Sequence, residues 1–328
     1  MFPITRLRRL RQTPQMREFA RETTVTLDDL IYPIFVEENT SENSPIESMP
    51  GQMRIAEKNL ATHIKGLYKE GIKSIILFGI SKNKDETGSD SLKKTGLLSR
   101  MISQAKEAQP EMLVISDNCF CEYTSHGHCG ILKKDKNGIS LDNDATLELL
   151  AEQALVSAEA GADIVAPSAM MDGQIQAIRK KLDENNFQNT PIMSYSTKFC
   201  SSFYGPFREA ADSHLTGDRK TYQMSYMNKM EALRESLEDE NEGADFLMVK
   251  PAGLALDIIA HIRTHSLLPL FAYQVSGEYA AIKFAAKAKV LNENDAIIET
   301  LTAIKRAGAS KIITYFAPDF AKFIKNNQ

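Results

Sequence analysis

The sequence predicts a (β/α)8 TIM barrel with an extended N-terminal arm, and three observations favour this fold class. The chain has 328 residues, enough for one large barrel and some additions. Eight short apolar runs have the composition of buried strands. Amphipathic segments separate most of these runs, so strands and helices alternate along the chain.

The predicted strands follow one another in an even succession. Each is a short apolar run of the kind that forms a strand inside a protein. In chain order they cover 31–36, 74–79, 113–120, 162–168, 191–198, 245–252, 268–276 and 311–316.

Two of the intervening segments show the apolar periodicity of helices. Residues 142–163 carry apolar side chains at helical spacing, and Asn143 or Asp144 is expected to cap the start of that helix. Residues 292–310 carry a second apolar stripe. A glycine then recurs where each of four helices gives way to a strand, suited to the left-handed conformation that ends a helix. These glycines are Gly71, Gly161, Gly243 and Gly308.

The strand and helix pattern places residues 1–30 outside the barrel. This segment is basic and too polar to form a core, so we expect an arm over 1–30 and a catalytic barrel over 31–328. An open doubly wound sheet is the alternative fold. No G-x-G-x-x-G motif follows the first strand, which disfavours it.

Composition and charge exclude several classes of protein. The formal net charge is −4, so no general nucleic-acid partner is expected. No apolar run approaches the roughly 20 residues that span a membrane. The N-terminus lacks the apolar centre of a secretory signal, and a cytoplasmic location is therefore expected. In that compartment clustered cysteines indicate metal binding or catalysis before disulfides.

Chemically active side chains gather where the predicted strands end. In a barrel the carboxyl ends of the strands meet at one mouth, which is where active sites lie. The residues at these ends are Asp117, Ser168, Lys198, Lys250, Ser276 and Tyr315.

Three cysteines follow the third strand. Cys119, Cys121 and Cys129 have a spacing that allows them to bind one zinc ion. Three protein ligands with one open position are typical of a catalytic zinc. His126 or His128 would instead complete a structural site, and the spacing leaves both kinds of site open.

Two lysines end neighbouring strands in the predicted barrel. A lysine that ends a buried apolar strand is costly unless it is paired or used. Lys198 and Lys250 would each disfavour the charge of the other, and apolar walls would disfavour both charges. We therefore expect one amine to be neutral near pH 7 and able to attack a carbonyl, forming a Schiff base.

Long motifs then resemble a known family over nearly the whole chain. They are DNCFCEYTSHGHCG, MSYSTKFCSSFYGPFREAADS, GDRKTYQM, MVKPAG and AYQVSGEYA. These resemble the signatures of the 5-aminolevulinate dehydratase family, also called porphobilinogen synthases. The resemblance implies an enzyme of tetrapyrrole (haem) biosynthesis that condenses two molecules of 5-aminolevulinate, with loss of water.

The resemblance also implies roles for the lysines and cysteines. Lys250, in MVKPAG, forms the Schiff base with the first substrate molecule. Lys198, in STKF, lies beside it as a second imine-forming or proton-transfer group. Cys119, Cys121 and Cys129 bind the catalytic zinc.

Substrate binding and assembly follow from the resemblance in the same way. Ser276 and Tyr315 hold the carboxylate of one substrate molecule. The other carboxylate is assigned to Arg208, Arg219 and Gln223. Glu231 matches a ligand of a magnesium ion at a subunit contact, and the arm wraps a neighbouring subunit in a homo-oligomer, commonly an octamer. Residues 252–259 depart from the proline-containing turn common in relatives, which leaves the shape of this loop open.

Two other functions remain as alternatives. A Schiff-base aldolase with a merely structural zinc would use the same barrel, but the phosphate-binding glycine loop expected late in such a barrel is missing. A catalytically silent zinc-binding or assembly protein would need no convergent set of lysines, thiols and clamps.

Overall fold

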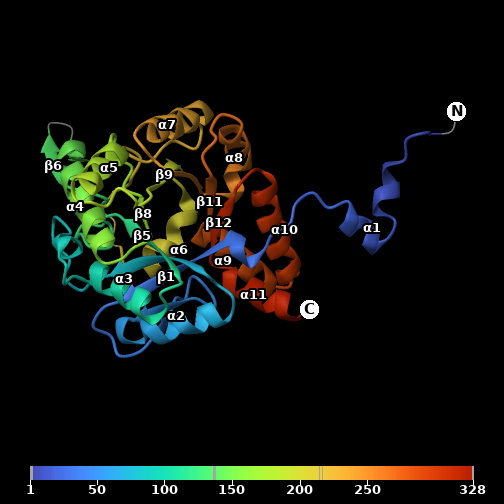
Figure 1. Cartoon of the computed structure of the whole chain (residues 1–328), viewed down its shortest axis with the longest axis horizontal. Helices are drawn as coiled ribbons and strands as arrows, with labels where there is room; N and C mark the ends of the chain where they lie inside the picture. Colours follow the sequence, from blue (N-terminus) through green and yellow to red (C-terminus); the bar gives the residue numbers. More distant parts are fainter. Residues whose placement is uncertain (1–2, 136–137, 214, 216, 327–328) are drawn as a thin grey trace.

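The computed structural model describes residues 3–135, 138–213, 215 and 217–326. Eight parallel strands form the barrel, in the neighbour order β8-β5-β4-β1-β12-β11-β10-β9 (Figure 1). A parallel bridge between Val165 and Ile192 brings the two ends of this order together. The predicted barrel is confirmed. Its strands are β1 (Leu30–Glu37), β4 (Ser74–Ile80), β5 (Leu113–Asn118), β8 (Ile164–Pro167), β9 (Met193–Lys198), β10 (Phe246–Lys250), β11 (Leu270–Gln274) and β12 (Lys311–Thr314).

Helices surround the barrel and follow most of its strands (Figure 1). The α-helices after the arm are α2 (Leu60–Lys69), α3 (Leu97–Ala108), α4 (Asn143–Glu159), α5 (Gln174–Glu184), α6 (Gly205–Ala210), α7 (Lys229–Asn241), α8 (Leu256–Arg263), α9 (Ser276–Lys287), α10 (Glu293–Arg306) and α11 (Ala317–Asn326). Short 3-10 helices are η3 (Glu57–Asn59), η4 (Ser89–Leu92), η5 (Ser202–Tyr204) and η6 (Gly253–Ala255). Two small antiparallel pairs are added to the eight barrel strands, β2 (Ser44–Pro45) with β3 (Met53–Ala56) and β6 (Leu132–Asp135) with β7 (Gly138–Leu141). β3 also pairs in parallel with the end of β1.

The glycines predicted at helix ends are confirmed, whereas the residue predicted to cap the start of α4 is not. All four glycines expected at helix ends have a positive φ, between 96° and 120°. The expected cap of α4 was wrong, because Asp142 takes that place and accepts a hydrogen bond from the N–H of Ala145 at 3.3 Å. Asn143 instead binds the backbone of Asp172, accepting from its N–H and donating to its carbonyl oxygen.

The N-terminal segment leaves the barrel and projects away from it (Figure 1). It contains η1 (Leu7–Arg11), α1 (Pro14–Phe19) and η2 (Leu27–Asp29). The segment joins the barrel at η2, where Asp29 forms an ion pair with Lys305 at 2.7 Å. Beyond that point large apolar side chains face outward, with Ile4 85% exposed and Phe19 88% exposed.

Over the described ranges, no helix combines the length and the apolar character needed to cross a bilayer.

Candidate active site

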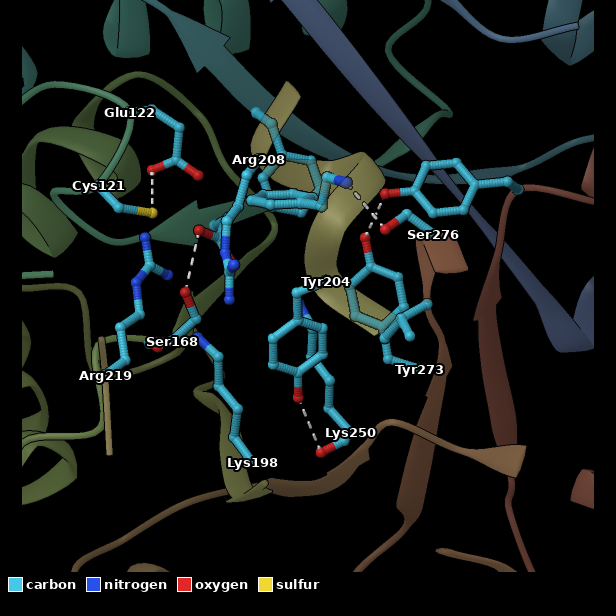
Figure 2. A pocket seen from close by; sticks show the side chains of 15 residues that line it. Cys121, Glu122, Ser168, Lys198, Tyr204, Arg208, Arg219, Lys250, Tyr273 and Ser276 are labelled. Atoms are coloured by element: carbon cyan, nitrogen blue, oxygen red, sulfur yellow. Dashed lines mark hydrogen bonds between the residues drawn. The ribbon is translucent and has the colours of Figure 1, made fainter. Parts of the chain in front are cut away.

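A cavity opens at the carboxyl ends of the barrel strands (Figure 2). It brings together the two lysines, two arginines, one thiol and three hydroxyl groups that the sequence singled out. Its lining residues are Phe78, Asp117, Cys121, Glu122, Ser168, Lys198, Tyr204, Phe207, Arg208, Arg219, Lys250, Tyr273, Val275, Ser276 and Tyr315.

Lys250 ends β10 inside an aromatic enclosure. Its side chain is 6% exposed, and its Nζ lies 4.1 Å from the ring centroid of Tyr273. The rings of Tyr195, Tyr204 and Phe207 have centroids between 5.1 and 5.4 Å from the same atom. Burial lowers the pKa of Lys250 to about 7, and the charge of Lys198 adds to this effect against the opposing charge of Asp117. The Lys250 amine can therefore be neutral near pH 7.

Lys198 ends the neighbouring strand β9 and is tied to a second polar group. Its Nζ donates to the carbonyl oxygen of Ser168 at 2.5 Å, and the Ser168 hydroxyl donates to Asp117 Oδ2 at 3.1 Å. Burial raises the pKa of Asp117. Asp117 Oδ1 has no hydrogen-bond partner within the described part of the chain. A buried carboxylate oxygen without a partner, beside two lysines, is suited to proton transfer or to binding an amine.

The three predicted thiols come together. The sulfur atoms of Cys119, Cys121 and Cys129 lie within 4.8 Å of one another, and all three side chains are buried. The Sγ atoms of Cys119 and Cys121 are 3.5 Å apart. Hydrogen bonds from Cys119 and Cys121 hold the pKa of Cys129 well below its usual range, so this thiol is the one most easily deprotonated for a metal.

The two nearby histidines do not join this group. His126 uses Nδ1 to accept from the N–H of His128 at 3.1 Å, and its Nε2 contacts the carbonyl oxygen of Glu86 at 3.1 Å. His128 Nδ1 contacts the Tyr222 hydroxyl at 3.1 Å. Both rings therefore shape the loop, and the alternative in which a histidine completes a structural zinc site loses support.

Ser276 and Tyr273 lie on the same side of the cavity as Lys250 (Figure 2), and Tyr315 lines the same cavity. The hydroxyl groups of Tyr273 and Tyr315 are 3.1 Å apart. Ser276 is the first residue of α9 rather than the last residue of the seventh barrel strand, because β11 ends at Gln274. These hydroxyl groups form a neutral set of donors near Lys250.

Arg208 and Arg219 enter the cavity from the segment that follows β9. Arg219 is buried, and its Nη2 donates to the carbonyl oxygen of Gly127 in the cysteine loop at 2.8 Å. The Nε atoms of Arg208 and Arg219 are buried without a partner among the described residues. Such donors are suited to binding an anionic group.

The structure places Gln223 and Glu231 outside this cavity. Both line a second pocket, together with Glu235 and Asp239 of α7. Glu231 accepts from the Asn228 side chain at 2.6 Å, in the first turn of α7. Burial raises the pKa of Asp239 to about 7, and its side chain accepts from the Ser194 hydroxyl of β9.

The family described as "Delta-aminolevulinic acid dehydratase" matches residues 4–323. The chain belongs to this family. A delta-aminolevulinic acid dehydratase of Escherichia coli (strain K12) is 58% identical over 319 residues, covering 97% of each chain. One of Bacillus subtilis (strain 168) is 49% identical over 322 residues, covering 98% of each chain.

A solved structure of the delta-aminolevulinic acid dehydratase family has the same fold. It is the delta-aminolevulinic acid dehydratase (porphobilinogen synthase) of Toxoplasma gondii ME49, in complex with the reaction product porphobilinogen. The TM-score is 0.96 at 43% identity, covering 100% of this chain and 94% of that chain. The barrel assigned from the strand pattern is thus the fold of this dehydratase family.

In this dehydratase family member, the cluster of Cys119, Cys121 and Cys129 has ligands suited to a metal ion. Three buried sulfur donors converge, and among the described residues no histidine belongs to this group. Three protein ligands leave one position for a substrate atom. Soft sulfur ligands favour zinc over magnesium or calcium.

Two residues of the site in this dehydratase family member, Glu122 and Tyr195, were not predicted from the sequence. Glu122 lines the cavity, and its Oε2 accepts from the Cys121 thiol at 3.2 Å. Its position directly after Cys121 was the available signal. Tyr195 lies under both lysines, with its ring centroid 5.6 Å from Lys198 Nζ and 5.1 Å from Lys250 Nζ. Strand periodicity gave no signal for it, because an extra residue in β9 shifts the register against β10 between Leu247 and Val249.

Proposed function

We propose that the protein is a porphobilinogen synthase that condenses two molecules of 5-aminolevulinate with loss of water. The observation that carries the proposal is the Lys250 amine, which is enclosed by aromatic rings and has its pKa lowered to about 7. It lies in one cavity with a second lysine, two arginines and a thiol of the buried sulfur cluster. An aldehyde or ketone is the natural reaction partner of such an amine.

The first step is imine formation on Lys250. Its neutral amine attacks the ketone carbon of one substrate molecule, the carbonyl oxygen leaves as water, and a carbon–nitrogen double bond remains. The Ser168 hydroxyl is hydrogen-bonded to Asp117, and both groups lie beside Lys198. Ser168 and Asp117 would supply and remove the protons of this step.

Two different clamps would hold the two carboxylates. Ser276 and Tyr315 offer neutral donors near Lys250, which add no positive charge beside an iminium. Arg208 and Arg219 offer charged donors on the side of the thiols, where bidentate binding fixes the second substrate molecule. Gln223 would support this second clamp from its outer side, since it lines the adjoining pocket.

Cys119, Cys121 and Cys129 would hold the zinc ion. When bound, the zinc orients and polarises the amine or carbonyl group of the second substrate molecule. The thiols lie beside Arg219, whose guanidinium group holds this cysteine loop through Gly127. The same residues thus place the second substrate between a metal and a carboxylate clamp.

The lowered pKa of Lys250 predicts a pH dependence. We expect the rate of imine formation to rise about tenfold as pH increases from one unit below to one unit above a midpoint near 7, because only the neutral amine attacks. The rate is measured with levulinate, a keto acid without an amino group, by borohydride reduction and intact-protein mass spectrometry. Lys198→Met is expected to move the midpoint to higher pH, since the Lys198 charge contributes to the lowered pKa. A midpoint in the ordinary lysine range near 10 would contradict this explanation.

Product analysis separates this function from the two alternatives. Zinc-loaded protein is incubated with 5-aminolevulinate, and porphobilinogen is identified by NMR and mass spectrometry. Porphobilinogen that disappears on chelation supports the synthase. Cleavage or condensation of sugar-like aldehydes that survives chelation would support the aldolase, and zinc binding without any imine would support the silent scaffold.

The projecting arm supports a homo-oligomer, for which we propose an octamer. We divide the chain into this arm, residues 1–30, and a catalytic barrel over 31–328. Ile4, Leu7, Leu10 and Phe19 are exposed on the arm, and a neighbouring subunit would cover them.

We also assign Glu231 to a magnesium ion at a subunit contact, next to the acidic pocket of α7. We also propose a cytoplasmic location, where reducing conditions would keep the cysteine thiols available to a metal.

A further inference from the structure

One carboxylate joins the two loops that would hold the same substrate molecule. Glu278 Oε1 accepts from the N–H of Gly253 at 2.6 Å, and Glu278 Oε2 accepts from the N–H of Val275 at 2.7 Å. Gly253 lies three residues after Lys250, and Val275 directly precedes Ser276. A single side chain therefore connects the backbone next to the imine-forming lysine with the backbone next to the carboxylate clamp.

Helix capping explains only half of this arrangement. Glu278 is the third residue of α9, from which a glutamate commonly reaches back to the N–H of the capping residue. That residue is Val275, whose side chain has no oxygen to return a hydrogen bond. The second oxygen of Glu278 is used by Gly253, which lies outside α9.

A side chain at position 253 would disturb this contact. A Cβ atom placed on Gly253 would lie 2.4 Å from Glu278 Oε1, so the Glu278 carboxylate would have to shift. The neighbouring residue Ala252 donates its N–H to the carbonyl oxygen of Tyr273 at 2.9 Å, so the loop lies directly along β11. The segment over 252–259, whose shape the sequence left open, forms η6 from Gly253 and continues into α8 from Leu256.

Ser276 is held from its other side as well. Its hydroxyl oxygen accepts from the N–H of Phe207 at 2.9 Å, and its O–H donates to the carbonyl oxygen of Phe203 at 3.3 Å. A Cβ atom on Gly277 would lie 2.5 Å from that same carbonyl oxygen. The position of Ser276 is therefore closely fixed. Its distance from Lys250 depends on the contacts that connect the ends of β10 and β11.

We propose that Glu278 is a positioning residue that sets the separation between Lys250 Nζ and Ser276 Oγ by joining Gly253 to Val275. This inference rests on the proposed function, in which the ketone carbon of one substrate reacts at Lys250 while its carboxylate binds Ser276. The chain between these two groups is short, so both ends engage together only at one separation. Misplacement by about 1 Å lowers a positioned reaction by as much as about 100-fold.

A pair of ketones tests the separation directly. Levulinate carries the carboxylate that Ser276 would bind, and methyl levulinate carries a neutral ester in its place. Each is incubated with the full-length protein and cyanoborohydride, and the concentration that gives half-maximal labelling of Lys250 is measured by peptide mass spectrometry. The wild-type protein is expected to prefer levulinate. In Glu278→Gln an N–H₂ group replaces one acceptor oxygen, so one contact is lost and the preference is expected to fall about tenfold.

Three variants make the test specific. Gly253→Ala disturbs the same contact from its other side and is expected to lose the preference too. Asn292→Ala removes a capping side chain that accepts from Asp295 at the start of α10, far from both loops in the chain, and is expected to keep the preference. Glu278→Asp keeps two acceptor oxygens and is expected to retain part of it, which also covers the case that Glu278→Gln fails to fold.

The outcomes distinguish this inference from the proposed function. A folded Glu278→Gln protein with the wild-type preference would overturn the role of Glu278 alone. Equal weakening of labelling by both ketones would also overturn it, because that is the result of a general loss of structure. A wild-type protein that neither ketone labels would overturn the proposed function and this inference together.

Discussion

Replacing Lys250 with methionine is expected to lower porphobilinogen formation by at least about 10⁴-fold while leaving the protein folded and more resistant to heat. The activity disappears because the amine that forms the imine is removed. The stability rises because a charged group that is 6% exposed is replaced by an apolar side chain of similar length. Turnover and melting temperature are measured on the same preparation.

The stability gain should depend on pH in a direction that follows from the lowered pKa. Lys250 has a pKa of about 7 in the folded protein and an ordinary, higher pKa in the unfolded chain. Between these two values the unfolded chain binds more protons, so the wild-type protein gains stability as pH rises. Lys250→Met removes this dependence, and its advantage in melting temperature should be largest below pH 7 and smaller at pH 9.

A second lysine provides the control for this prediction. Lys283 of α9 forms ion pairs with Glu293 at 2.6 Å and Asp319 at 3.0 Å. These hydrogen bonds and charges raise its pKa against the effect of burial. Lys283→Met is expected to lower the melting temperature and keep the activity. An inactive Lys283→Met protein, or a fully active Lys250→Met protein, would contradict the distinction between the two lysines.

Replacing Cys121 with serine is expected to remove tight zinc binding and to lower porphobilinogen formation by at least about 100-fold. A serine hydroxyl is a poor substitute for a thiolate as a zinc ligand, and only Cys119 and Cys129 would remain. Imine formation on Lys250 with levulinate should persist, because that step needs the amine and not the sulfur cluster. Zinc content is measured by competition with a chromophoric chelator, and the imine by reduction and mass spectrometry.

Cys200 provides the matched control for the zinc site. It follows β9, is partly exposed and lies outside the group of three sulfur atoms. Cys200→Ser should therefore keep both zinc and turnover. A Cys121→Ser protein that retains the wild-type zinc content and activity would show that the three-thiol group is not the metal site.

The barrel was predictable because its signal is repeated along the chain. Four of the eight short apolar runs end a helix–glycine–strand unit, and the left-handed glycines such as Gly161 and Gly308 appear where the pattern places them. Parallel strands then bring their carboxyl ends to one mouth. For this reason Lys198 and Lys250 could be placed in one site from the order of strands alone.

Other parts of the site depend on contacts that no local pattern encodes. Tyr195 reaches the lysines because β9 contains an extra residue against β10, and a regular strand would alternate differently. The expected cap of α4 was wrong because Asn143 binds a distant loop at Asp172. Glu278 reads as an ordinary capping residue until the fold brings Gly253 beside it. In each case the deciding partner is remote in sequence.

The most direct measurement is to trap the imine with the substrate itself. Zinc-loaded protein is mixed with 5-aminolevulinate, reduced with borohydride, digested and mapped by mass spectrometry. We predict an adduct on Lys250, alone or together with Lys198, and none on Lys283. A folded, zinc-loaded protein without any adduct on Lys250 would contradict the central claim and leave its buried amine without a chemical role.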